Sequence, residues 1–171
     1  MKTSPMTLRA LVNAIDTLTT RGAHAARWLT FAMVLVTLTI VVLRYAFEIG
    51  AIPLQEFVMY MHGLVFLIGI PYGVKENTHV RVDILYTRLQ PRHQALVDLS
   101  GHVVFLLPLA AFILVTSWPY TLASWRVLEG SAEVGGIPAI FLLKTLIPLT
   151  AGLLILQSLA EIMKKLAVLR T

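Results

Sequence analysis

The sequence predicts an all-α membrane protein with four transmembrane helices, and three observations support this fold class. Of its 171 residues, 57% are hydrophobic and 13% are charged, whereas about 25% of the residues of a typical soluble domain are charged. Four apolar runs are long enough to cross a hydrocarbon core of about 30 Å, which requires roughly 20 helical residues. The basic residues gather in alternate connections between these runs, as they do on one side of a membrane.

The four spans are predicted at about residues 28–47, 54–74, 95–119 and 137–160. No Asp, Glu, Lys or Arg occurs between Phe57 and Val74 or between Leu99 and Trp125. The spans form a membrane domain at residues 28–161, with a cytoplasmic amphipathic N-terminal segment at 1–27 and a cytoplasmic tail at 162–171. We interpret the first apolar run as a retained span, since it is too long for a secretion signal and no small-residue cleavage site follows it.

The distribution of basic residues predicts that both termini are cytoplasmic. Lysine and arginine are frequent before the first span, between the second and third, and after the fourth. The other two connections are poor in both. Because basic loops stay inside, the sequence predicts an N-in, C-in topology.

Two further helices are predicted at the inner membrane surface. Leu11, Ile15 and Leu18 recur at helical spacing, which indicates a short amphipathic helix within residues 1–27. A plain helical extension of the first span explains this pattern equally well, with Gly22 as the point where the direction changes. The charged connection at residues 73–91 predicts an interfacial helix that ends near Leu89, before Pro91 opens the third span.

Several classes of function are excluded by the sequence. Cysteine is absent, so disulfides, thiol catalysis and cysteine metal sites are excluded. No phosphate-binding glycine loop, nucleophile elbow or His-Glu-x-x-His motif occurs. The basic residues lie at the ends of spans and form no stripe for nucleic acid. We therefore expect neither an enzyme nor a resident cofactor.

Three charged residues near the outer side are predicted to form one network. Arg44 ends the first span, Glu56 opens the second, and Lys144 enters the fourth by about 10 Å. An ionisable group inside a bilayer requires a partner. We expect Glu56 to pair with Arg44, Lys144 or both, as a packing link more than a proton relay or an interface.

Two histidines raise a second possibility. Asp98 and His102 share a helix face, where a hydrogen-bonded pair facing the loop or a partner is favoured over a cation site. His62 and His102 could ligate a haem, which would make the chain a membrane anchor for a redox enzyme. Their depths differ by roughly 8 Å, which disfavours that alternative.

The chain resembles the small membrane subunit of tripartite ATP-independent periplasmic (TRAP) transporters. The resemblance runs from about Trp28 to Glu161 and rests on the following segments: Arg44–Phe47, Ile52–Glu56, His79–Leu85, Ser124–Trp125, Glu129, Ser131, Gly135–Pro138, Lys144, Ile147–Pro148, Leu156–Gln157 and Glu161. One departure is visible, because the family often has a Trp and two adjacent acids where this chain has Leu54, Gln55 and Glu56.

This resemblance implies a multi-pass protein of the bacterial inner membrane that is itself non-catalytic. It implies a large membrane subunit that moves as an elevator and couples uptake to sodium, and a periplasmic binding protein that delivers an organic anion. The inner connection includes His79, a further structural or interface candidate, and we expect it to offer Arg81, Asp83 and Arg88 to phospholipid headgroups or to the large subunit. A free-standing small transporter is a further alternative, which the scarcity of polar groups in the spans disfavours.

Overall fold

The computed structural model describes residues 5–78 and 86–170, and within them every regular element is a helix. Four continuous helical stretches there are long and apolar enough to cross a membrane: Arg9–Ala46, Ile52–Lys75, Pro91–Arg126 and Ile140–Leu169. The predicted fold class of four long apolar helices is therefore confirmed. The predicted helix between the second and third spans, with His79, Arg81 and Asp83, lies largely outside the described residues.

The first helix, α1 (Pro5–Ala46), has 42 residues and passes through Gly22 without a break. The predicted short amphipathic helix is therefore the first part of α1 and not a separate element. Alanines at 23, 25 and 26 favour continuation, because Ala has the highest helix propensity and offsets one glycine. Gly22 instead permits close packing, since a Cβ there would lie 3.2 Å from Ile68 Cγ2 on α2.

The second helix, α2 (Ile52–Lys75), carries Pro53 in its first turn, where the missing N–H costs nothing. The last helix, α6 (Ile140–Arg170), has 31 residues and begins two residues after Pro138. It continues through residues 162–170, so the predicted tail is helical almost to its end.

The third stretch has three parts in one continuous run: α4 (Pro91–Ser100), the π-helical segment η1 (Gly101–Leu106) and α5 (Leu107–Arg126). The N–H of Leu107 donates to the carbonyl of His102, five residues earlier. Pro108 follows directly and lacks an N–H, so it cannot extend a regular ladder. A π-turn before this proline accommodates the missing donor.

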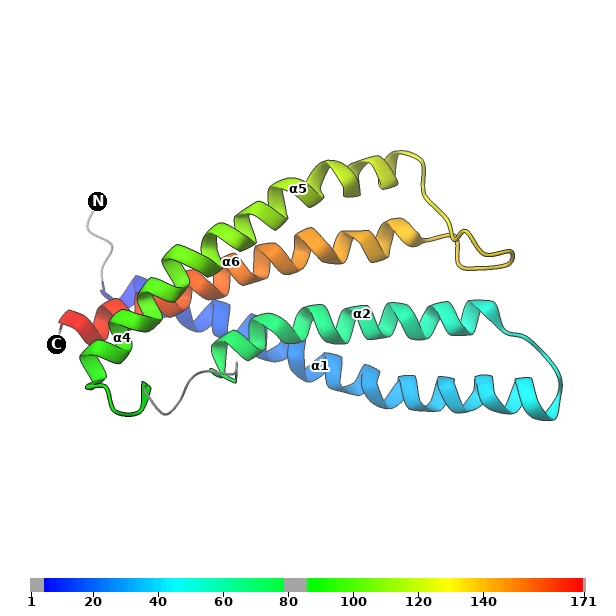
Figure 1. The fold of residues 1–171 in the computed structure, drawn as a ribbon, viewed down its shortest axis with the longest axis horizontal. Coiled ribbons are helices and arrows are strands. Elements are labelled where there is room, and N and C mark those ends of the chain that lie inside the picture. Colours follow the sequence, from blue (N-terminus) through cyan, green and yellow to red (C-terminus); the bar gives the residue numbers. More distant parts are fainter. Residues whose placement is uncertain (1–4, 79–85, 171) are drawn as a thin grey trace.

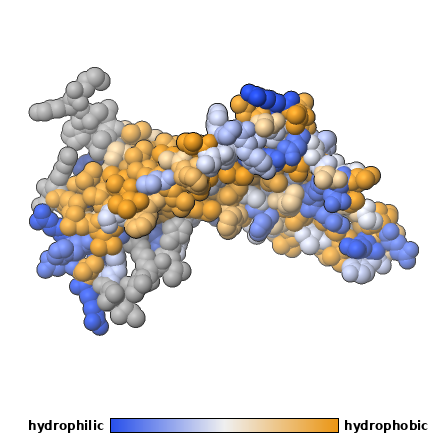
Figure 2. All heavy atoms as spheres, turned by 45° about the horizontal axis from the view of Figure 1, so that its top comes forward, coloured by the Kyte–Doolittle hydropathy of each residue, from blue (hydrophilic) through white to orange (hydrophobic). Residues whose placement is uncertain are grey.

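The helices lie side by side with α2 and α6 in the middle and α1 and α5 at the edges (Figure 1). Both termini lie at one end, here called the inner end, and the α1–α2 and α5–α6 connections lie at the outer end (Figure 1). In the most apolar 18-residue stretch of each span, only 6%, 17%, 6% and 33% of the residues are buried. Figure 2 shows hydrophobic atoms across much of one face, with hydrophilic atoms toward both ends. The spans therefore leave most of their lateral surface open.

Candidate functional site

Glu56 holds the outer connection between α5 and α6. It is the fifth residue of α2, and its Oε1 accepts a hydrogen bond from the Ser131 hydroxyl. Its Oε2 accepts from the backbone N–H of Ile137 at 2.5 Å. One carboxylate thus joins both sides of the segment 127–139, which we call the outer loop, to the second span.

The outer loop closes tightly around this carboxylate. The N–H of Ser131 donates to the carbonyl of Ile137 at 3.1 Å, and the N–H of Glu133 donates to Ser131 Oγ at 3.0 Å. A Cβ on Gly136 would lie 2.6 Å from Glu56 Oε1, so the loop packs against Glu56 too closely for a side chain there. Gly135 has φ of +79°, a conformation that glycine adopts without strain. The sequence Gly135-Gly136 thus serves the turn that meets Glu56.

Lys144 pairs with the outer loop and not with Glu56. Its Nζ lies 2.5 Å from Glu129 Oε2 and 4.2 Å from the ring centroid of Tyr120. Among the described residues, neither Lys144 nor Arg44 forms an ion pair with Glu56, so the predicted network is wrong in its pairing. The loop folds back over the start of α6, which brings Glu129 to Lys144 and leaves Glu56 to bind neutral donors.

The Glu129–Lys144 pair predicts an acid transition in the outer loop. The hydrogen bond from Lys144 lowers the pKa of the Glu129 carboxyl from its ordinary value of 4.5. A carboxyl with a lowered pKa stabilises the fold above its unfolded pKa and loses that contribution as the pH falls through its folded pKa. We therefore expect the loop to hold its structure down to about pH 5 and to loosen only in stronger acid.

Fluorescence of Trp125 measures this transition, because its indole N–H donates to Thr145 Oγ1 at 2.8 Å beside the loop. Replacing Trp28 and Trp118 with phenylalanine leaves Trp125 as the sole reporter. The Glu129→Gln variant should lack the transition. If Glu129→Gln showed a transition with the same midpoint pH as the wild type, another group would be responsible for it.

A second polar cluster, the inner clasp, joins α1 to α6. Gln157 has no exposed surface and lies at its centre. Its Nε2 donates to Asp16 Oδ1 at 3.0 Å and to Glu161 Oε1 at 3.2 Å, while its Oε1 accepts from Thr19 Oγ1 at 2.8 Å. Lys164 pairs with Asp16 at 2.8 Å and with Glu161 at 2.7 Å. The buried amide and the two carboxylates are thus satisfied by one another and by Lys164.

Among the described residues, no hydrogen bond joins Asp98 to His102, so the predicted pair is wrong, and each side chain binds another residue. Asp98 Oδ2 accepts from the Tyr86 hydroxyl at 2.8 Å and pairs with Lys165 at 2.6 Å. His102 Nδ1 lies 3.2 Å from the Ser158 hydroxyl on α6. Both side chains share a helix face, as their spacing predicted, but α6 supplies a partner for each.

The two histidines of the haem alternative have separate surroundings. His62 is exposed on α2 and stacks on Phe66 with a centroid distance of 6.4 Å. His102 lies against α6. No group of three or more His, Asp or Glu side chains that could hold a metal ion occurs in residues 5–78 and 86–170.

The sequence prediction missed the inner clasp and the partners of Glu56. The signals were present, because Asp16 is the only acid within residues 5–46. Gln157 and Glu161 lie four residues apart, at the end of the largely apolar run that forms the fourth span. Such polar residues require partners when their helix lies in or near a membrane. Their pairing depends on how α1 crosses α6, which the sequence pattern does not reveal.

These features define a class: a multi-pass helical membrane protein whose polar side chains bind one another at the two ends of its helices. A family model described as "Tripartite ATP-independent periplasmic transporters, DctQ component" matches residues 33–168. The chain therefore belongs to the DctQ component family of TRAP transporters, which are proteins of the bacterial inner membrane.

A relative from Vibrio cholerae supports this assignment. It is named C4-dicarboxylate TRAP transporter small permease protein DctQ, and it is 32% identical over 89 residues. The matched region covers 52% of this chain and 38% of that protein, so it spans less than half of the relative's length. No solved structure matches the chain.

Proposed function

We propose that this chain is the non-catalytic small membrane subunit of a TRAP-type transporter and acts as a scaffold for a large, multi-span subunit. The open lateral surface of the spans carries this proposal, since no more than 33% of any span's most apolar stretch is buried within the chain. In the outer loop and in the inner clasp, the polar side chains bind one another. This pairing also supports a scaffold, because a transport site usually needs polar groups that converge on a substrate within the bilayer. A stationary brace needs lateral packing surfaces and no cargo site.

The proposed orientation places both termini in the cytoplasm. The arginines of the first part of α1 and the basic residues near the end of α6 lie at the inner end, which supports that assignment by the positive-inside rule. The outer loop would then face the periplasm, where a binding protein approaches. In this orientation the chain has a cytoplasmic segment at residues 1–27, a membrane domain at 28–161 and a cytoplasmic tail at 162–171.

The large subunit is proposed to move as an elevator and to couple uptake of an organic anion to sodium. The name of the Vibrio cholerae relative, which specifies C4-dicarboxylates, supports an organic anion. The substrate would be bound by the large subunit and the binding protein and not by this chain. Arg81 and Asp83 are proposed to contact phospholipid headgroups or the large subunit.

Co-purification and reconstitution test this function. The tagged chain from native membranes is expected to bring down a large multi-span subunit. Liposomes that contain both subunits, the binding protein and a sodium gradient should take up the substrate, and omission of any component should abolish uptake. Uptake by this chain alone would make it an autonomous transporter. A co-purified cofactor-bearing subunit with an absorbance band would make it a redox anchor.

A further inference from the structure

His62 lies on the second span at the depth of the hydrocarbon core. The stretch of α2 from Glu56 to Lys75 rises about 28 Å, close to the core thickness of about 30 Å, and carries no other Asp, Glu, Lys or Arg between these two residues. At 1.5 Å per residue, His62 is about 9 Å from the level of Glu56 and about 20 Å from that of Lys75. Lipid offers no hydrogen bond at this depth.

Two sides of α2 pack against the neighbouring spans. Toward α6, a Cβ on Gly63 would lie 3.1 Å from Leu143 Cδ1. Toward α1, a Cβ on Gly22 would lie 3.2 Å from Ile68 Cγ2. These close approaches leave the remaining side of α2 for contacts outside the chain.

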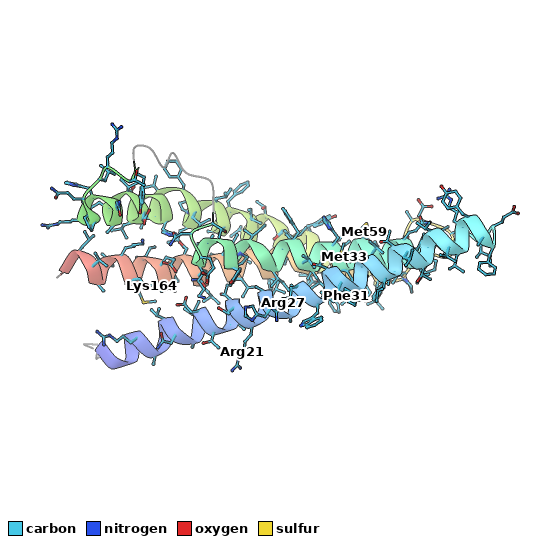
Figure 3. The ribbon with its side chains drawn as sticks, turned by 90° about the horizontal axis from the view of Figure 1, so that it is seen from below. Arg21, Arg27, Phe31, Met33, Met59 and Lys164 are labelled. Atoms are coloured by element: carbon cyan, nitrogen blue, oxygen red, sulfur yellow. The ribbon has the colours of Figure 1, made fainter. Side chains whose placement is uncertain are left out.

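That remaining side carries residues spaced alternately four and three apart, so they share one helix face. We call this face the open stripe, and it consists of Gln55, Met59, His62, Phe66 and Gly69. Met59 is 45% exposed and Phe66 is 61% exposed, and a Cβ on Gly69 would have no neighbour within 4 Å. Figure 3 labels Met59 on α2 and Met33 on the adjacent helix α1. The open stripe thus runs through the middle of the second span without cover.

The imidazole of His62 needs hydrogen-bond partners that the chain does not supply. A neutral imidazole carries one donor and one acceptor. Within residues 5–78 and 86–170, the His62 ring stacks on Phe66 but forms no hydrogen bond. The exposed threonines Thr39 and Thr116 differ, because each hydroxyl donates to the carbonyl four residues earlier in its own helix, at 2.9 and 2.8 Å. His62 cannot be satisfied in that way.

We infer that a transmembrane helix of the large subunit docks on the open stripe and presents a hydroxyl, amide or carboxylate to His62. Polar side chains within membrane spans almost always face protein or water, and histidine forms hydrogen bonds between neighbouring helices. Lipid tails would leave the imidazole unsatisfied. Gly69 lets a partner backbone approach closely, and Met59 and Phe66 pack on either side of the hydrogen bond. The inference rests on the proposed function, which supplies the large subunit.

His62→Leu should weaken binding of the large subunit about three- to tenfold in nanodiscs, as expected when a hydrogen bond between membrane helices is lost. His62→Gln keeps a donor and an acceptor and should restore most of the affinity. Thr39→Val removes an exposed hydroxyl that its own helix satisfies, so it should bind as the wild type does. Without the large subunit, hydrogen exchange of His62→Leu should match that of the wild type, because His62 holds no hydrogen bond within the described chain.

A benzophenone attached to Phe66→Cys identifies what covers the open stripe, since the natural chain has no cysteine. Irradiation should join it to a membrane-spanning peptide of the large subunit that carries a polar side chain. Adducts with lipid alone, or with a second copy of this chain, would overturn the inference when the large subunit co-purifies, and the proposed function would still stand. Equal affinities of His62→Leu and the wild type would also overturn it. If no large subunit co-purifies with the wild-type chain, the proposed function fails and this inference fails with it.

Discussion

Replacing Glu56 with alanine is expected to release the outer loop and to lower the free energy of unfolding by about 2 to 3 kcal/mol. The reason is that Ser131 and the N–H of Ile137 both lose a charged acceptor at once. Hydrogen exchange measures the local effect, and protection of the Ile137 amide should fall roughly 30-fold or more, since each 1.4 kcal/mol is a factor of ten. The inner end of α1 should keep its protection.

Two matched variants separate this role from a general effect of charge. Glu133→Ala removes an exposed glutamate from the same loop and should leave Ile137 protected. Glu56→Gln keeps one carbonyl acceptor and should fall between the wild type and Glu56→Ala. Unchanged protection of Ile137 in Glu56→Ala would show that the loop is held by other contacts. A selective change in substrate affinity with normal assembly would instead place Glu56 in a binding site.

The fold could be predicted because the apolar character that marks a membrane span extends over a whole segment and does not depend on single residues. Each span exceeds the length that a hydrocarbon core requires, so the run lengths alone distinguish four spans from a soluble bundle. Helix ends were harder to place, because α1 and α6 continue into polar sequence that is still favourable for helix. Pro108 marked an irregularity, but whether it produces a kink or a π-turn depends on neighbouring contacts.

The pairing of charges could not be predicted from depth alone. Glu56 and Lys144 lie at similar depths, and that similarity suggested an ion pair. The outer loop intervenes with its own acid, Glu129, and with two neutral donors for Glu56. The sequence gives only the depth of each charged residue along the membrane normal. Which residue it pairs with depends on the path of the outer loop in three dimensions.

The two polar clusters explain why polar residues persist in such an apolar chain. A helix packed in lipid gains little from apolar contact with its neighbour, so hydrogen bonds and close packing determine which surfaces meet. The inner clasp fixes α1 against α6, and the outer loop fixes α2 near the start of α6. The position of α6 is thus fixed at both of its ends, against α1 at the inner end and against α2 at the outer end.

Replacing Gln157 with methionine is expected to loosen α1 from α6 by about 2 to 3 kcal/mol, because its two hydrogen bonds to α1 are lost, at about 1 to 1.5 kcal/mol each, and the one to Asp16 is to a charged group. Methionine preserves the side-chain volume, so the loss reports hydrogen bonding and not a cavity. Trypsin cleavage after Arg21 measures this local opening in the purified full chain. Its rate should rise at least tenfold, since each 1.4 kcal/mol of opening free energy is a factor of ten in the population that trypsin can cut.

Leu159→Met provides the matched control, because Leu159 lies two residues away on α6 and is 42% exposed. It should cleave at the rate of the wild type. Asp16→Asn in the Gln157→Met background should raise the rate further, since the ion pair of Asp16 with Lys164 still joins α1 to α6 after the amide is gone. Wild-type cleavage of Gln157→Met would mean that apolar packing through Ile15 and Ala26 holds α1 in place, and the inner clasp would then contribute only the choice of register between the two helices.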